Sequence, residues 1–217
     1  IILLSPILQD DLQNIETYKK IIYLSNGVED NFINDNFEEY ISKKVFDKDI
    51  NILYLAHMMR DKGCFEAIEL VNKHKIENIH FHFAGGWQNK EDEKLFLDYI
   101  KENQLEKFIT LHGFVSGDKK KELFKSSHLL LYPSKNDAFP LTLLEAFSYG
   151  LPVLATNEGS IPFIIDEKSG IVIDNLNKLD LAFEEILEKY INIETSRYCR
   201  KRYLENFSLE QFEENLL

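Results

Sequence analysis

Cysteine is scarce in this sequence. Its two cysteines, Cys64 and Cys199, stand far apart in a chain of 217 residues and form neither a C-x-x-C pair nor a disulfide framework. Such usage is typical of a reducing compartment. We therefore interpret both residues as ordinary thiols rather than as metal ligands.

Long apolar runs are also absent. No uninterrupted apolar stretch approaches the roughly 18–20 residues that cross a bilayer, and no charged-then-apolar signal peptide opens the chain. We expect a cytoplasmic protein without a transmembrane segment, and a peripheral position at the inner face of the cell membrane stays open.

Positive charge is in deficit. The formal net charge is −12, whereas proteins that bind nucleic acids need a basic face to displace counterions from phosphates. Strong polybasic attachment to an anionic membrane is disfavoured for the same reason. Lys119, Lys120 and Lys121 form a local basic run, which we interpret as a solvated helix face. No nucleic-acid partner is expected.

Several motif signatures are missing. The sequence has no G-x-G-x-x-G after its first regular strand, no G-x-x-x-x-G-K-[ST] and no G-x-S-x-G. This removes the main support for the usual dinucleotide, P-loop and serine-hydrolase interpretations. His80 and His82 alternate onto one face of a predicted strand, but no acidic or cysteine companion has metal-like spacing. We predict packing or surface roles for both and no metal site.

What is present is a regular alternation of strand and helix patterns from Ile50 onward, within a composition that is 44% hydrophobic. Runs rich in β-branched and aromatic residues predict strands at 50–56, 79–85, 108–114, 128–134, 152–156 and 170–174. The remaining segments predict helices at 64–75, 90–103, 118–127, 141–149, 162–166, 176–190, 194–206 and 208–217. Near-continuous apolar strands separated by helices indicate an α/β class, a doubly wound Rossmann-like parallel sheet covered on both faces.

The first 49 residues break this regularity. The pattern predicts a strand at 1–5, a helix at about 10–20, a strand at 21–25 and a turn at Asn26–Gly27. Because "IILLS" opens the chain without an initiator Met or a polar lead-in, we expect a truncated or excised chain. The predicted organisation is a remnant of a preceding α/β domain (1–28), a connecting segment (29–49), a main ligand-binding domain (50–193) and closing helices (194–217).

Ligands of doubly wound sheets bind beyond the carboxyl ends of the strands. The helix start at 139–144 has no acidic side chain, which leaves backbone amides open to an anion such as phosphate. Glu145 follows about one turn later, either as a clamp for two ribose hydroxyls or as an ordinary surface glutamate. Lys62 stands at another helix start, where an anion would explain it and coincidence is the alternative. Gly85 marks a turn or a close approach to a ligand.

A further set of motifs recurs in a fixed order. The sequence has "KG" after the first regular strand, "AGG" after the second, "HGFV" after the third and "YPS" after the fourth, followed by a double-acid segment, "GLPVLAT" and "G-x-I-P" at 159–162. With this order the segment 112–165 resembles the C-terminal, donor-binding domain of retaining GT-B glycosyltransferases of the family 4 type, the glycosyl transferases group 1. The likeness extends over 50–217 and implies the C-terminal half of a GT-B fold, preceded by a fragment of the N-terminal Rossmann domain.

The resemblance implies a role for each matching residue. The family signature Glu-x7-Glu becomes Asp137-x7-Glu145, so that Glu145 would hold the ribose hydroxyls of the donor nucleotide. Asp137 would face the donor sugar and Lys62 would neutralise the diphosphate, which makes these two the catalytic candidates. The implied donor-binding set comprises Glu145, Arg60, His57, Gly85, Phe114, Val115, Phe139, Pro140, Leu141, Thr142 and Leu143.

Three positions depart from the family pattern. Asp137 is one methylene shorter than the usual Glu, a difference in reach of roughly 1 Å that is large enough to affect turnover. His57 stands where a phosphate-binding Arg is common, although Arg60 could supply that charge. Phe163 replaces an acid that often follows "G-x-I-P".

The implied function is transfer of a sugar, with retention, from a UDP- or GDP-linked donor to a glycan or lipid-linked acceptor in cell-surface polysaccharide or lipopolysaccharide synthesis, with no separate cofactor. In this family the acceptor site lies in the N-terminal domain, so the chain alone is expected to be inactive. Phe207, Phe212 and Leu216 are then expected to be partly exposed. A non-catalytic nucleotide-sugar-binding or scaffold module, and a sugar-phosphate phosphorylase or epimerase on the same fold, are the alternatives.

Overall fold

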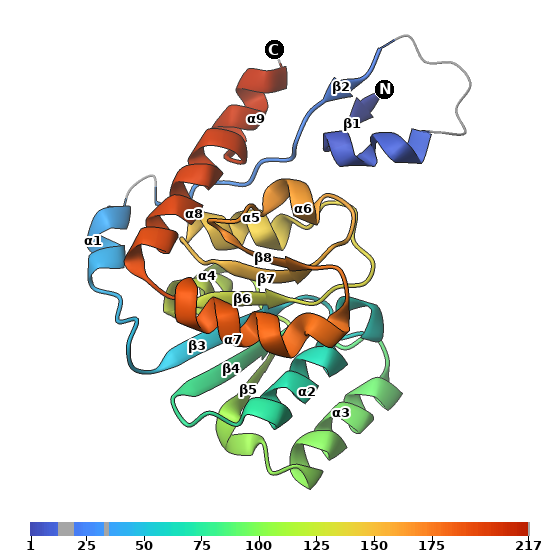
Figure 1. Ribbon diagram of the computed structural model, residues 1–217, viewed down its shortest axis with the longest axis vertical. Helices are drawn as coiled ribbons and strands as arrows, with labels where there is room; N and C mark the ends of the chain where they lie inside the picture. Colours follow the sequence, from blue (N-terminus) through green and yellow to red (C-terminus); the bar gives the residue numbers. More distant parts are fainter. Residues whose placement is uncertain (13–19, 33–34, 217) are drawn as a thin grey trace.

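The computed structural model describes residues 1–12, 20–32 and 35–216. Its centre is a six-stranded sheet in the order β5-β4-β3-β6-β7-β8 (Figure 1), in which every pairing is parallel. The strands are β3 (Ile50–Leu55), β4 (Ile79–Ala84), β5 (Ile109–Gly113), β6 (Leu129–Tyr132), β7 (Val153–Thr156) and β8 (Gly170–Ile173). All six match strands predicted from the sequence, within one or two residues at each end.

Helices cover both faces of this sheet. One face carries α2 (Cys64–His74), α3 (Lys90–Glu102) and α7 (Leu179–Lys189), and the other carries α4 (Gly117–Ser126), α5 (Leu141–Ser148), α6 (Ile161–Ile164) and α8 (Ile193–Asn206). Short 3₁₀ turns at η2 (Arg60–Lys62), η3 (Glu106–Phe108) and η4 (Leu176–Lys178) lead into the elements that follow them. The predicted doubly wound α/β architecture is confirmed.

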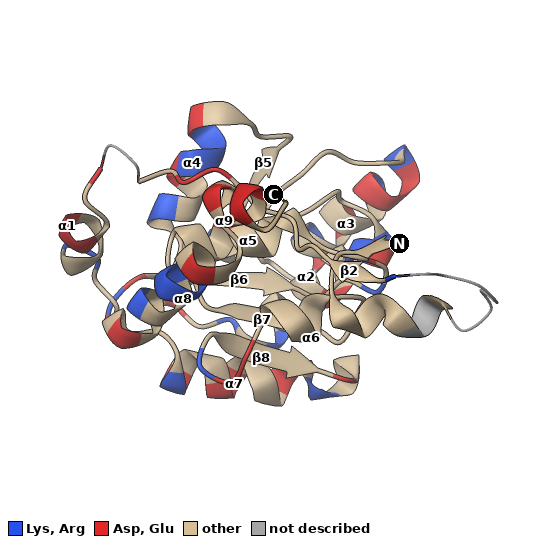
Figure 2. Cartoon of the chain, turned by 90° about the horizontal axis from the view of Figure 1, so that it is seen from above, with Lys and Arg blue, Asp and Glu red and all other residues tan. Residues whose placement is uncertain are grey.

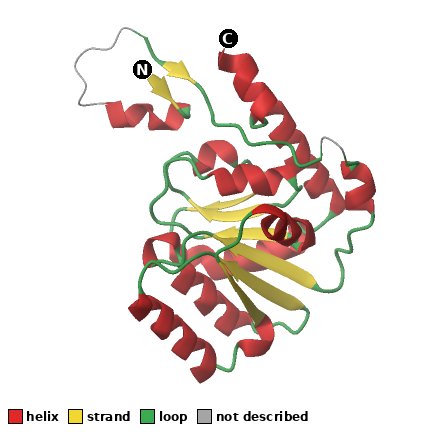
Figure 3. Ribbon diagram, turned by 180° about the vertical axis from the view of Figure 1, so that it is seen from behind, coloured by secondary structure: helices red, strands yellow, loops and turns green. Residues whose placement is uncertain are grey.

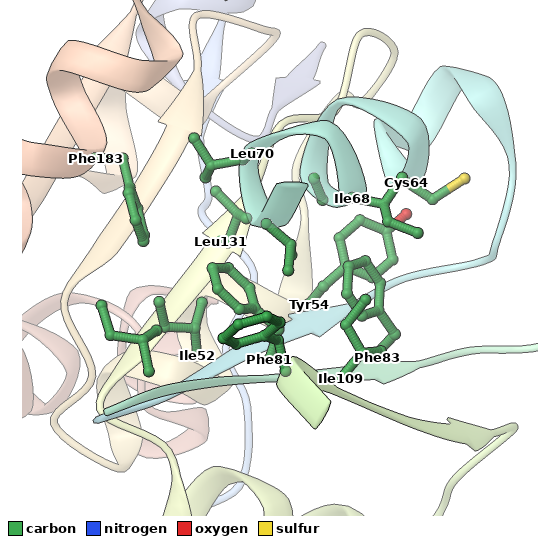
Figure 4. Close-up of a cluster of buried hydrophobic side chains, with 14 of the residues drawn as sticks. Ile52, Tyr54, Cys64, Ile68, Leu70, Phe81, Phe83, Ile109, Leu131 and Phe183 are labelled. Carbon is green, nitrogen blue, oxygen red and sulfur yellow. The ribbon is translucent and has the colours of Figure 1, made fainter. Parts of the chain in front are cut away.

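Alternation along the strands builds two apolar cores. Ile52 and Tyr54 of β3 face α2, while Leu53, between them, faces the opposite layer. In the first core Phe81 and Phe83 of β4 lie beside Tyr54 under α2 (Figure 4). Each such side chain contributes roughly 1.5–3 kcal/mol when it is fully buried, so the central strands are held rigidly in place.

The chain before the sheet forms a small separate element. β1 (Ile2–Leu3) and β2 (Ile22–Tyr23) pair in parallel, and η1 (Pro6–Leu12) is a 3₁₀ helix between them. The strands lie inside the two predicted at 1–5 and 21–25. Most of the helix expected at about 10–20 lies outside the described residues.

The connecting segment contains a helix that the sequence pattern did not predict. α1 (Phe37–Ser42) begins after Asn36, whose side chain accepts hydrogen bonds from the backbone amides of Glu38 and Glu39. A helix of this length presents a single buried residue, Ile41, so it displays no repeat that a periodicity argument could detect.

The closing helices return to the start of the chain. Between α8 and α9 (Leu209–Leu216), Ser208 forms a parallel bridge with Val28, and Figures 1 and 3 show α9 projecting past the sheet toward β1 and β2. Leu216 is exposed and Phe212 is half-buried, as expected. The expectation for Phe207 is wrong: it is only 1% exposed because it packs against Phe163 within the main domain.

None of the helices among the described residues is both long and apolar enough to span a bilayer.

Candidate functional site

The candidate site begins at β3 and β6, which lie side by side at the centre of the sheet and send the chain to helices on opposite faces. This is the position at which doubly wound sheets bind ligands. The buried Tyr54 hydroxyl lies 3.2 Å from the His57 carbonyl oxygen and 3.1 Å from that of Lys62, which closes the loop after β3. Gly63 ends this loop in a left-handed conformation, with φ at 75°.

Lys62 and Asp137 meet at this position. Lys62 Nζ lies 2.6 Å from Asp137 Oδ2 and donates to the Asn136 carbonyl oxygen at 2.6 Å. The Tyr132 hydroxyl donates to the same Asp137 oxygen, also at 2.6 Å. Burial, together with the Asp137 carboxylate, raises the pKa of Tyr132, so its hydroxyl remains a proton donor. The two catalytic candidates therefore form one hydrogen-bonded cluster.

The loop containing "GSIP" packs directly against Asp137. A Cβ atom on Gly159, where φ is 49°, would lie 2.1 Å from the Asp137 carbonyl oxygen, so only glycine fits there. The next amide, of Ser160, donates to the Ala138 carbonyl oxygen at 2.8 Å. The Ser160 hydroxyl is buried against that of Ser5, with 2.8 Å between the two oxygens. The loops after β3 and β7 thus both contact Asp137, which lies in the loop after β6.

The amino terminus of α5 follows Asp137. Phe139 and Leu143 are buried and anchor the turn, whereas Leu141 is 46% exposed and Thr142 is half-buried. Pro140 occupies the N-cap position and no side chain caps the helix. Because the first amides of an α-helix lack partners within it, this end of α5 offers donors to an anion.

Glu145, one turn further along α5, lines a pocket of about 540 Å³ together with Phe114 and Val115. Phe114 is 75% exposed, whereas Val115 is buried. Three residues of the implied donor-binding set therefore lie at one pocket. Asp137 and Lys62 do not line this pocket. Asp137 precedes α5, and Lys62 contacts Asp137 from η2.

Three further predicted residues have different surroundings. Arg60 pairs with Asp92, with 2.7 Å between Nη2 and Oδ1, and stacks over Phe65, so its guanidinium is already engaged. His57 is exposed in the same loop. A Cβ atom on Gly85 would lie 1.8 Å from the Ala56 carbonyl oxygen, so this glycine is required by the close packing of the strand ends.

The histidines of β4 belong to a polar chain on the sheet. His82 Nδ1 lies 3.0 Å from His112 Nε2, and His80 Nε2 lies 2.8 Å from the Thr110 hydroxyl. Both residues are half-buried. Within the part of the chain that the structure describes, no group of three or more His, Cys, Asp or Glu residues is arranged to hold a metal ion.

Sequence reasoning missed Lys120, Tyr132 and Tyr149. Lys120 was assigned to a solvated helix face, but its Nζ lies 2.6 Å from Glu145 Oε1. Tyr149 also lines the Glu145 pocket, and its buried hydroxyl has no hydrogen-bond partner among the residues that the structure describes. Their positions in the sequence could have indicated a place at the site, because Lys120 lies one turn after a strand-end loop and Tyr132 is the last residue of β6.

Comparison with known proteins places the chain in a family. A family model described as glycosyl transferases group 1 matches residues 36–203. The chain belongs to this family. The resemblance found in the sequence is thereby confirmed, and the structural matches confirm a Rossmann-like half of a GT-B fold.

Individual relatives of this chain are distant. The sulfoquinovosyl transferase SQD2 of Arabidopsis thaliana is 31% identical over 63% of this chain and 29% of its own length. The capsular polysaccharide biosynthesis glycosyltransferase CapH of Staphylococcus aureus is 28% identical over 64% of this chain and 36% of its own. The chain thus spans about a third of these relatives.

Among solved structures, Anabaena Alr3699/HepE in complex with UDP and glucose superposes with a TM-score of 0.80 at 14% identity, covering 99% of this chain and 61% of that one. At this level of identity the likeness concerns the fold.

Proposed function

We propose that this chain is the donor-binding part of a glycosyltransferase that moves a sugar, with retention of configuration, from a nucleoside diphosphate sugar to a glycan or lipid-linked acceptor. The acceptor is proposed to bind a further N-terminal domain, without which the chain does not transfer sugar. The biological setting that we propose is cell-surface polysaccharide synthesis on the cytoplasmic side of the membrane. Relatives named for capsule and O-antigen synthesis support this setting.

The observation that carries the proposal is the position of Glu145 between a pocket and an uncapped helix terminus. Its carboxylate lines the pocket with Phe114 and Val115, where a nucleoside would place its ribose hydroxyls on the acid and its base against the strand-end loop. A carboxylate that accepts hydroxyl hydrogen bonds forms charge-assisted contacts, which are worth roughly 1.5–3 kcal/mol each.

The diphosphate is proposed to lie across the start of α5. The amides of Leu141 and Thr142 would donate to it, and the positive end of the helix dipole favours the anion. Lys62 would then neutralise charge as the bond between the anomeric carbon and the phosphate oxygen breaks, which is electrostatic stabilisation of a leaving group. Asp137, still held by the Tyr132 hydroxyl, would accept hydrogen bonds from the sugar hydroxyls once Lys62 turns to the diphosphate.

A second candidate function is a nucleotide-sugar-binding module without turnover. The ion pair between Lys62 and Asp137 favours it, because the two groups assigned to the donor neutralise each other at 2.6 Å. The candidates differ in one respect: an enzyme must exchange this ion pair for contacts with the donor, whereas a binding module keeps it.

The test is calorimetric titration of the purified chain with UDP, GDP and ADP. We expect one nucleotide to bind selectively, and Glu145→Gln to weaken it by about tenfold or more. Glu184→Gln on α7, an exposed residue on the opposite face of the sheet, is the matched control and keeps wild-type affinity. A folded chain that binds none of the three overturns the donor-site proposal. Sugar transfer by the full-length protein then separates the enzyme from the binding module.

A further inference from the structure

The ion pair between Lys120 and Glu145 joins two helices across the pocket. Lys120 comes from α4 and Glu145 from α5, both line the 540 Å³ pocket, and Nζ and Oε1 are 2.6 Å apart. Figure 2 shows the basic residues of α4 in blue. Lys120 is not among the residues to which the family resemblance assigns a role.

The pair differs from the surface ion pairs of the same protein. Its two side chains are 28% and 25% exposed, against 71% and 62% for Lys43 and Glu39. Exposed pairs contribute little because water and side-chain entropy compete with them. Partial burial removes part of that competition, so Lys120 and Glu145 hold each other in a defined geometry.

Packing also restricts the lysine itself. Its Nζ lies 6.0 Å from the centre of the Phe124 ring, and Phe124 stacks on Tyr149 with 5.2 Å between ring centres and 3° between ring planes. The aliphatic stem of a lysine packs well along such apolar surfaces. Lys120 is therefore supported from its own helix before any ligand arrives.

This geometry determines what the carboxylate can still accept. A carboxylate offers about four acceptor positions, of which Lys120 occupies one on Oε1. Among the described residues, the side-chain contact of this carboxylate is made through Oε1 and leaves Oε2 without a hydrogen bond. The carboxylate thus keeps acceptor capacity for a pair of adjacent hydroxyls while its orientation is fixed by the amine.

We propose that Lys120 is a positioning residue that orients the Glu145 carboxylate for a vicinal diol and thereby makes the site selective for ribonucleotides over 2′-deoxyribonucleotides. This inference rests on the proposed function, because it assumes that the pocket receives the ribose of a donor nucleotide. The structural alternative is that the pair merely joins α4 to α5.

The test compares the tightest-binding diphosphate of the UDP, GDP and ADP set with its 2′-deoxy analogue, by calorimetry on the folded chain. In the Lys120→Met variant we expect affinity for the ribonucleotide to fall about tenfold and affinity for the 2′-deoxy analogue to change less than about twofold, because only the diol depends on the orientation of Glu145. Lys120→Arg restores most of the selectivity, since it keeps a cation that can donate to a carboxylate.

Lys119→Met is the matched control for charge. Lys119 is the neighbouring exposed residue of α4, donates to the His112 carbonyl oxygen at 3.5 Å and does not line the pocket. It keeps wild-type selectivity. If Lys120→Met loses affinity equally for both nucleotides, or keeps the wild-type selectivity, the positioning role is overturned. The proposed function still stands in that case, provided that the wild type binds the nucleotide. Absence of binding by the wild type overturns both.

Discussion

Lys62 and Asp137 are 75 positions apart in the sequence, yet Nζ and Oδ2 lie 2.6 Å apart beyond the carboxyl ends of β3 and β6. Their side chains are only 20% and 16% exposed. The hydroxyl of the buried Tyr132 donates to the same oxygen, which gives the acid a second fixed contact. The position of Asp137 thus depends on a neutral donor as well as on a cation.

The Tyr132→Phe variant tests the contribution of this neutral hydroxyl to the position of Asp137. The substitution removes one hydroxyl and no charge, so we expect nucleotide affinity to change less than about twofold and sugar transfer by the full-length protein to fall about tenfold. Parallel measurement of Kd and kcat checks this. Transfer at the wild-type rate would show that Tyr132 does not position Asp137 for catalysis.

A substitution at Gly63 tests how much the tight turn after Lys62 contributes to stability. An added Cβ would lie 2.1 Å from the Pro133 carbonyl oxygen, at a φ of 75°, so Gly63→Ala combines backbone strain with a collision. We expect a loss of about 3 kcal/mol in the free energy of unfolding. Gly113→Ala is the control: φ is 64° and nothing lies within 4 Å of its Cβ position, so about 1 kcal/mol is expected. Equal losses in urea denaturation would contradict the collision.

Arg200 ties the connecting segment to α8. Its Nη2 lies 2.7 Å from Asp30 Oδ2, with side chains 9% and 19% exposed. Arg200→Met leaves a half-buried acid without its cationic partner and is expected to destabilise the fold by about 3 kcal/mol. Arg197→Met, which breaks an exposed pair with Glu38, is expected to cost less than about 1 kcal/mol. Equal shifts of the denaturation midpoint in the two variants would contradict the expected difference between the half-buried and the exposed ion pair.

The pH dependence of stability depends in part on His82. Burial, with His80 and His112 nearby, lowers the pKa of His82 from 6.5 to about 4. The unfolded chain therefore binds this proton first as the pH falls, so the stabilising contribution is complete above pH 6.5 and declines toward pH 4. We expect the melting temperature to fall over this interval with a smaller slope in His82→Gln. The residual slope belongs to His80, His112 and His128, whose pKa values burial also lowers. Identical slopes in both proteins would contradict this assignment.

The sequence predicted the sheet accurately because β-strands buried on both faces have a local signature. Every strand from Ile50 onward is a short apolar run bounded by turn residues, and this pattern does not depend on distant contacts. α1 lacked such a signature, since its stability comes from the Asn36 cap and from packing against α8. Phe207 was wrongly expected to be exposed because its partner, Phe163, is remote in the sequence.

The site was predictable to the extent that it is local. Asp137, the uncapped start of α5 and Glu145 lie in one continuous segment, and strand-end positions predicted that Phe114 and Lys62 would lie at the same edge. The partners of these residues were not predictable. Whether Lys120 meets water or Glu145 depends on how α4 and α5 pack, and Arg60 meets Asp92 only because α3 begins beside η2.

The pairing of Asp30 with Arg200 also has a consequence for folding during synthesis, because one partner is translated long before the other. The two residues are 170 positions apart, and translation at about 5–20 residues per second separates their appearance by on the order of ten seconds or more. For that interval Asp30 lacks its guanidinium partner and α1 lacks α8, so the connecting segment is held on the nascent domain only by contacts such as that of Tyr40 with Lys125. Fusing a stalling sequence before or after α8 would therefore distinguish an open chain, sensitive to proteases at residues 29–49, from a closed one.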